Sequence, residues 1–194
     1  MNFDSDSYRS SDEFKTIHLM YENYEEDNKA LNGILTSNIE LVSFYTGYNS
    51  LFTKMFAIAC SNSFEKKWLD FLPNFLSGNN PLTKSFIRTQ AVDRKFHTMF
   101  DWKNKSAGPF YGAFGEGFKK FIANKIKGDS ILKSKQDAFL ELGQLRNLIV
   151  HEGIHNFSLQ RDIKSIYELF NESLDYSVFI YESICTFFQE ECTQ

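Results

Sequence analysis

Apolar side chains recur at intervals of three and four residues along most of this chain, with polar residues between them. This spacing predicts helices, because one face of a helix returns about every 3.6 residues. No segment alternates Val or Ile with polar residues as half-buried strands do, so we expect no sheet. The predicted helices cover residues 12–35, 37–72, 83–100, 118–126, 130–151 and 158–190. The sequence therefore predicts an all-α bundle of about five or six helices.

The second predicted helix, over residues 37–72, carries a long apolar stripe. We expect Pro73 to end it, because proline lacks the backbone N–H that would continue the hydrogen bonding, and residues 77–81 then form a loop. A break near residues 60–63 is an alternative within the same stretch. The side chains expected to be buried along this helix are Phe44, Tyr48, Leu51, Met55, Ile58 and Ala59.

The stretch before the helix predicted over residues 130–151 is rich in turn-forming residues. Residues 103–117 hold four of the ten glycines together with Pro109, which predicts a turn-rich, aromatic insertion. At the start of the chain, residues 1–10 are polar and are expected to be frayed. The length suits a single domain over residues 1–194.

The composition is ordinary for a soluble globular protein, with 42% hydrophobic and 24% charged residues. The aromatic share of 16%, which includes 21 Phe, predicts a well-filled core and is compatible with an apolar surface that binds a partner. A net charge of −4 argues against a sequence-independent DNA coat, although a local basic patch is compatible with RNA binding. Lys and Arg cluster over residues 88–105 and 119–135, and solvated helix faces are the simpler interpretation of both clusters.

Three cysteines without paired spacing, and a polar beginning that does not resemble a secretory signal, fit a reducing compartment. We therefore expect a cytoplasmic protein. No run approaches the roughly 18 apolar residues of a membrane-spanning helix, so no membrane association is expected.

The most informative motif lies at the end of the helix predicted over residues 130–151. It is the run Arg146-Asn147-Leu148-Ile149-Val150-His151, followed by Glu152-Gly153. It places a permanent cation and a titratable imidazole close together on an apolar scaffold. Cleavage of RNA by its own 2′-OH needs both, one to hold the phosphate and one to move a proton. The alternative interpretation is structural, because cations near a helix C-terminus interact favourably with the helix dipole.

This run matches the arginine, polar residue, spacer and histidine pattern of the HEPN superfamily, and the chain resembles bacterial HEPN proteins of the RiboL-PSP and MAE type. The resemblance includes the pair Phe64-Glu65 in the second predicted helix and the aromatic, glycine-containing stretch over residues 110–119. It implies a four- or five-helix fold and a homodimer whose motif helices meet across the interface. It also implies a metal-independent endoribonuclease, with a role in a toxin–antitoxin or phage-defence system.

Arg146 and His151 are five residues apart, so an ideal helix directs their side chains about 140° apart around its axis. Either the helix unwinds near His151, or a two-fold axis brings two motifs together into a composite pocket. In that pocket Arg146, His151 and Asn147 are the expected catalytic residues, and Glu65 and Glu152 are candidate supporting carboxylates. The expected products carry 2′,3′-cyclic phosphate and free 5′-OH ends.

No cofactor or metal is expected. His151 and His155 have the spacing of a zinc-binding helical pair, but Gly153 is expected to end the helix between them. The expected partners are the RNA substrate, a second copy of the chain, and an antitoxin or an ATPase. The alternative function is a non-catalytic helical interaction module, or an adaptor for a nucleotidyltransferase or ATPase. An open cleft around Arg146 and His151 favours the enzyme, and a packed interior favours the module.

Overall fold

The computed structural model describes residues 3–35, 38, 40–78, 80–93 and 96–191. Within these ranges the fold is all-helical, as predicted, apart from one isolated bridge between Asp101 and Ser106. The elements are α1 (Ser5–Arg9), α2 (Asp12–Leu35), α3 (Leu41–Ser77), α4 (Pro81–Ile87), the π-helical turn η1 (Arg88–Val92), α5 (Phe96–Met99), α6 (Gly108–Gly112), α7 (Glu116–Lys127), α8 (Ser130–Glu152) and α9 (Ile163–Glu191).

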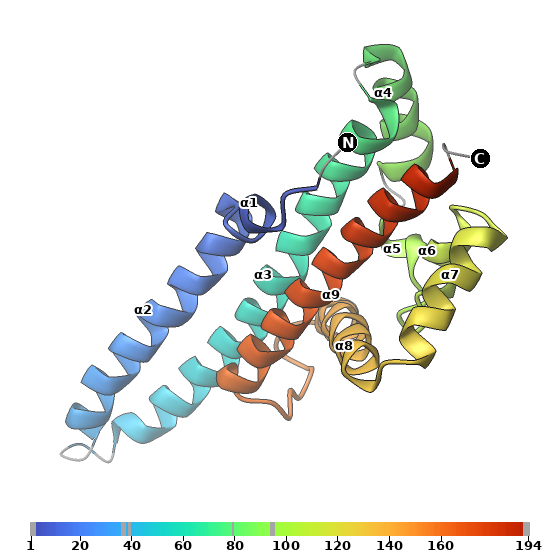
Figure 1. Cartoon of the computed structure of the whole chain (residues 1–194). Coiled ribbons are helices and arrows are strands. Elements are labelled where there is room, and N and C mark those ends of the chain that lie inside the picture. The colour runs from blue at the N-terminus through green and yellow to red at the C-terminus, as the bar shows by residue number, and fades with distance from the viewer. Residues whose placement is uncertain (1–2, 36–37, 39, 79, 94–95, 192–194) are drawn as a thin grey trace.

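The long helices set the shape of the molecule (Figure 1). α2 and α3 pair as an antiparallel hairpin, and the tip of this hairpin, where α2 ends and α3 begins, projects beyond the other helices. α8 packs against both α3 and α9, and α7 packs on α8. α4 lies at the end of α3 opposite the hairpin tip. No helix in the described part of the chain is long and apolar enough to cross a membrane.

The centre of the core is a cluster of aromatic rings around Trp68 of α3. The ring centroids of Phe110 and Phe139 lie 4.8 Å and 5.7 Å from that of Trp68. The Trp68 indole N–H donates to Ser177 Oγ at 2.9 Å, so the buried indole is satisfied. Phe110 belongs to the predicted turn-rich insertion, which therefore forms part of the core rather than an appendage.

Trp102 fixes the same insertion against α8. Its ring lies so close to the backbone of Gly143 that a Cβ at this position would come within 2.1 Å of the Trp102 ring. Only glycine leaves room for this approach. The insertion and the helix that carries the motif are thus held in one packed unit.

The prediction that Pro73 ends the second helix is wrong. α3 continues to Ser77, and no break occurs near residues 60–63. Pro73 is buried inside the helix, and Phe71 and Phe75, two residues before and after it, pack on the rings of Tyr181 and Phe188 of α9. The apolar burial around it outweighs the lost backbone hydrogen bond. α3 ends instead at Gly78, whose φ of 56° lies in the left-handed region that glycine adopts readily.

Two further boundaries differ from the prediction. The helix expected over residues 83–100 is divided into α4, η1 and α5, and residues 94–95 lie outside the described ranges. The last helix begins at Ile163 rather than after Ser158. Asp162 supplies the cap, because its Oδ1 accepts from the Ser165 backbone N–H at 2.8 Å.

The expectation of a frayed beginning is wrong for residues 5–9, which form α1. The Asp4 side chain caps this short helix by accepting from the backbone N–H groups of Asp6 and Ser7. Tyr8 anchors it in the core, where its hydroxyl lies 2.6 Å from Ser177 Oγ. Residues 1–2 lie outside the described ranges.

The stripe expected to be buried along the start of α3 is instead largely exposed. Phe44 is 73% exposed and Met55 is 53% exposed, and Tyr48 and Leu51 are exposed as well. Only α2 covers this half of the helix (Figure 1), since α8 and α9 pack farther along α3. Ile58 and Ala59, where that cover begins, are partly buried.

Candidate active site

The end of α8 is fixed by the turn that follows it. The helix runs unbroken to Glu152, and Gly153 turns the chain with a φ of 86°. Asn156 Nδ2 donates to the Glu152 carbonyl oxygen at 3.1 Å, which satisfies one of the last carbonyls of the helix. The buried Lys54 of α3 donates through Nζ to the carbonyl oxygen of Ile154 at 2.9 Å. The motif therefore sits on a helix end that α3 holds in place.

Arg146 lies in a cavity of about 470 Å³ between α8 and α3. Its Nη1 donates to Asn147 Oδ1 at 3.1 Å, and its Nε is buried without a hydrogen-bond partner. A buried guanidinium N–H without an acceptor costs free energy. A guanidinium beside a cavity is a group suited to bind an anionic oxygen. The other residues that line this cavity are Asn62, Glu65, Lys66, Leu69, Asp70 and Arg88.

His151 lies on the exposed surface of the last turn of α8. Asn147, partly buried, precedes it by four residues, so the two side chains share one face of the helix. Asn147 thus contacts Arg146 by hydrogen bond and lies one turn from His151. Leu148, 36% exposed, belongs to the same face, three residues before His151. The face that carries the imidazole is open to solvent and partly apolar.

The structure brings some of the predicted site residues together and separates others. Glu65 lines the same cavity as Arg146. His151 and Glu152 are both exposed beyond that cavity. Because α8 does not unwind before Glu152, the first way of joining Arg146 and His151 within one chain is not observed.

Other residues of the cavity were not foreseen from the sequence. Asn62 precedes Glu65 by three residues on the same helix face, so the spacing along α3 contained a signal for it. Arg88 comes from η1, after the α3–α4 connection, and no local spacing could place it beside Arg146. Its guanidinium is paired with Asp93 at 3.4 Å.

A family model described as RiboL-PSP-HEPN matches residues 22–186, which covers most of the chain from α2 to α9. The chain belongs to the RiboL-PSP-HEPN family. The resemblance inferred from the motif is thereby confirmed, and membership indicates an RNA-related function of nuclease type in general. No curated protein and no solved structure matches the chain.

In this HEPN protein, the helical His-x-x-x-His arrangement is not formed. Gly153 ends α8 as predicted, and His155 lies in the turn after it. Among the described residues, no three His, Cys, Asp or Glu side chains lie together in a way that could hold a metal ion.

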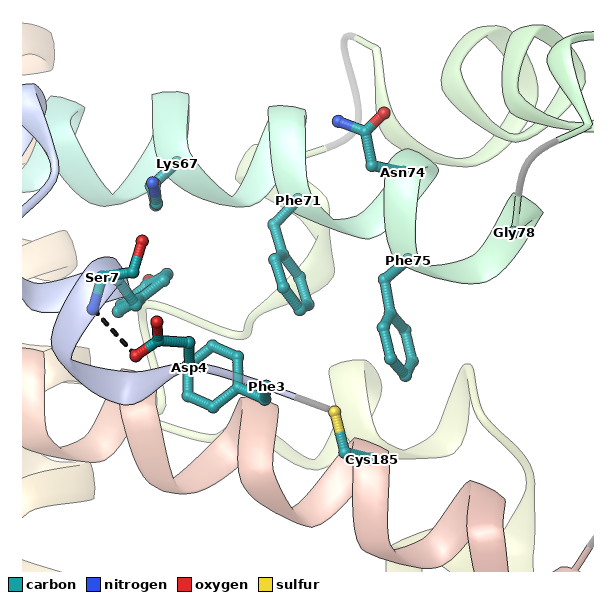
Figure 2. A pocket seen from close by; sticks show the side chains of 10 residues that line it. Phe3, Asp4, Ser7, Lys67, Phe71, Asn74, Phe75, Gly78 and Cys185 are labelled. Atoms are coloured by element: carbon teal, nitrogen blue, oxygen red, sulfur yellow. Dashed lines mark hydrogen bonds between the residues drawn. The ribbon is translucent and has the colours of Figure 1, made fainter. Parts of the chain in front are cut away.

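A second cavity of the HEPN protein, about 430 Å³ in volume, opens between α1, α3 and α9 (Figure 2). Figure 2 shows Phe71 and Phe75 of α3 on one side and Cys185 of α9 on the other. The Lys67 ammonium lies 5.2 Å from the centre of the Tyr8 ring. None of the motif residues lines this cavity, so the chemistry of the motif belongs to the cavity at Arg146.

Proposed function

We propose that this protein is a metal-independent endoribonuclease that acts as a homodimer with a composite site. One observation carries the proposal: Arg146 is held in a cavity beside Asn147, while His151 is exposed on an unbroken helix about 140° around the axis. A phosphate that contacts Arg146 of one copy can contact His151 of another copy if the two motif helices meet about a two-fold axis.

The exposed surface at the end of α8 supports such a pairing. Leu148 and Val150 are 36% and 49% exposed on a helix whose other large apolar side chains are mostly buried. A two-fold contact over Leu148 removes apolar area from water and brings the imidazoles of two copies close together. The two Arg146 side chains then lie on either side of the pair.

In this site the 2′-OH of RNA attacks the adjacent phosphorus. The bond from O2′ to phosphorus forms while the bond from phosphorus to O5′ breaks. One His151 accepts the 2′ proton, and the imidazolium of the second copy's His151 donates a proton to O5′. Arg146 stabilises the extra negative charge on the non-bridging oxygens, and Asn147 holds the guanidinium in position. The products are a 2′,3′-cyclic phosphate and a 5′-OH.

The test compares the wild-type protein with His151→Ala, Arg146→Ala and the control His155→Ala on total RNA and tRNA in EDTA. We expect His151→Ala to lose about 10²- to 10⁴-fold in cleavage rate, because proton transfer contributes that much, and His155→Ala to cleave normally. End-group analysis should find 2′,3′-cyclic phosphates. Full activity in a folded His151→Ala protein would refute the mechanism.

The composite site has its own test. Mixing Arg146→Ala and His151→Ala proteins under conditions of subunit exchange creates heterodimers that hold one intact Arg146 and one intact His151, on different copies. The heterodimer keeps one Arg146 and one of the two imidazoles, so only one of the two proton transfers is assisted, and we expect it to cleave faster than either parent homodimer but slower than the wild type. A mixture that exchanges subunits and stays inactive would contradict the shared site without touching the assignment of the two residues.

The proposed cellular role is defence or growth arrest, in a toxin–antitoxin or phage-defence system and in the cytoplasm. Expression of the wild-type protein should then arrest growth, while His151→Ala should not. Co-expression of the antitoxin or ATPase that partners it should relieve the arrest.

A non-catalytic interaction module is the second candidate, and the hairpin tip favours it. An apolar pocket of about 210 Å³ opens there between α2 and α3. Its lining is entirely aliphatic and aromatic: Leu31, Ile34, Leu35, Leu41, Phe44, Tyr45 and Tyr48. Exposed apolar area of this kind marks partner surfaces. Failure of a well-folded dimer to cleave any RNA, together with capture of a nucleotidyltransferase or ATPase at this tip, would favour the module.

A further inference from the structure

The cavity between the insertion, α7 and α8 differs in chemistry from every other hollow described above. Its volume is about 820 Å³, within the range of sites for small molecules. The lining residues are Lys105, Ser106, Ala107, Gly108, Tyr111, Lys119, Ala123, Ile126, Lys127, Gly128, Ser130, Lys133 and Gln136. Four of them are lysines and none is acidic.

The four lysines reach the cavity from separate segments. Lys105 comes from the insertion, Lys119 and Lys127 from the two ends of α7, and Lys133 from the first turn of α8. The sequence alone favoured solvated helix faces for the two basic clusters, residues 88–105 and 119–135, to which these lysines belong. The fold instead gathers these lysines around one concave surface, where their fields add.

Three of these lysines also contact carboxylates that lie outside the lining. Lys119 Nζ lies 3.2 Å from Glu116, Lys105 Nζ lies 3.8 Å from Glu141, and Lys133 pairs with Asp137. These ion pairs are largely exposed, and such pairs contribute only about 0–1 kcal/mol each. They therefore leave the lysines able to turn toward a more highly charged anion.

Lys127 differs from the other three, because no carboxylate of the described residues pairs with it.

The floor of the cavity is polar and hydrogen-bonded. Gln136 and Tyr111 are only 8% and 5% exposed, and the Gln136 Nε2 donates to Tyr111 Oη at 2.7 Å. The Tyr111 hydroxyl also contacts the hydroxyl of the fully buried Tyr176. Burial raises the pKa of Tyr111 to about 12, so its hydroxyl stays neutral. Ala123 and Ile126 supply an apolar wall beside these groups.

We propose that this cavity binds a phosphorylated nucleotide, with lysines on the phosphate and the wall and floor against the base and sugar. The nucleotide is either free or part of an RNA strand, and the phosphate chemistry is shared. Lys133 and His151 are 18 residues apart on α8, about 27 Å along the helix, so this is a different place from the motif. The inference goes beyond the proposed nuclease, and either can fail without the other.

The experiment measures binding to full-length His151→Ala protein, so that no probe is cleaved. The probes are a short fluorescein-labelled single-stranded RNA, AMP, adenosine and inorganic phosphate. The main variant is Lys127→Ala with Lys133→Ala, and its matched control is Lys15→Ala with Lys29→Ala, which removes the same charge from exposed positions on α2. A third variant, Ala123→Trp, fills the cavity without changing the charge.

We expect the Lys127/Lys133 variant to weaken binding of the preferred probe about tenfold or more. If that probe is RNA, its salt dependence should become shallower by roughly 1.4, about 0.7 for each lysine lost. The α2 control should bind like the parent protein, and Ala123→Trp should bind weakly. Competition by AMP identifies the free nucleotide as a ligand, whereas binding of RNA alone identifies a strand.

Three results would overturn the proposal: no binding of RNA or AMP by the parent protein, unchanged binding in a folded Lys127/Lys133 variant, or inorganic phosphate that binds as well as AMP. The last result would show that the wall and floor recognise nothing.

Discussion

The two halves of α3 have the same apolar spacing and opposite surroundings. In residues 56–77, Phe56, Phe64 and Trp68 are at most 1% exposed, because α8 and α9 cover them. In residues 41–55, Phe44 and Met55 are mostly exposed, and α2 is the helix that lies alongside (Figure 1). Periodicity thus identifies the apolar face of a helix. Whether the rest of this chain or another molecule covers that face depends on the tertiary fold, which periodicity does not report.

Charge distinguishes the hairpin formed by α2 and the start of α3 from the rest of the molecule. Residues 20–53 contain five acidic residues and one lysine, so this segment has a net charge of −4, equal to that of the whole chain. An acidic, apolar tip repels RNA and suits a protein partner with basic and apolar side chains. The lysine-lined cavity and the Arg146 cavity lie on the other part of the molecule, with α8.

The largest expected difference between the two halves is in stability. Trp68→Ala should lower the free energy of unfolding by about 3–5 kcal/mol, because it empties the centre of the core. Phe44→Ala, on the exposed half, should change it by less than about 0.5 kcal/mol. Urea unfolding followed by circular dichroism measures both. A similar loss in the two variants would mean that the tip is covered in solution.

Two glycines sharpen the contrast. Gly143→Ala should destabilise the protein by about 1–3 kcal/mol, since the added Cβ meets the Trp102 ring. Gly47→Ala, in the exposed half of α3, meets nothing within 4 Å and should stabilise the helix by about 0.5–1 kcal/mol. Thermal unfolding of the two variants should shift in opposite directions. A shift in the same direction would argue against the close contact at Trp102.

Tyr111, which is buried in the covered part of the molecule, should make the stability depend on alkaline pH. The pKa of Tyr111, raised to about 12 by burial, exceeds its ordinary value of 10.0. Its contribution to stability is therefore complete below pH 10 and is lost as the pH rises through about 12, by about 1.4 kcal/mol for each pH unit. Tyr111→Phe should give a shallower loss of stability over this window. Identical slopes for both proteins would contradict the assigned burial.

Much of the fold could be predicted from local pattern. The spacing gave α2 its observed bounds and α8 to within one residue, since caps and stop signals such as Gly153 are local. Pro73 misled the prediction because its cost is local, while the packing of Phe71 and Phe75 on Tyr181 and Phe188 of α9 is not. The same limit applies to the start of α3, because its lack of cover depends on where α9 begins, at Ile163, beside the middle of α3.

Some residues of the candidate site could be predicted from local sequence, and others are placed there only by tertiary packing. Arg146, Asn147 and His151 were recognisable as a motif, and the fixed geometry of a helix already implied that the first and last diverge. The tertiary fold places Arg88 in the cavity with Arg146 and brings Lys54 to the carbonyl of Ile154. Spacing along the chain could not predict either contact. The lysine cavity likewise needs α6, α7 and α8 in place before its charges converge.

Lys54 stands where the exposed half of α3 meets the covered half, and its ammonium is tied to the turn after the motif. From Leu41 to Lys54 the helix extends about 20 Å, so the hairpin tip lies about that far from the point where Lys54 contacts Ile154. A molecule that tilts the tip would pull on a carbonyl three residues beyond His151. The hydrogen bond from Lys54 thus links the hairpin directly to the turn that follows the motif.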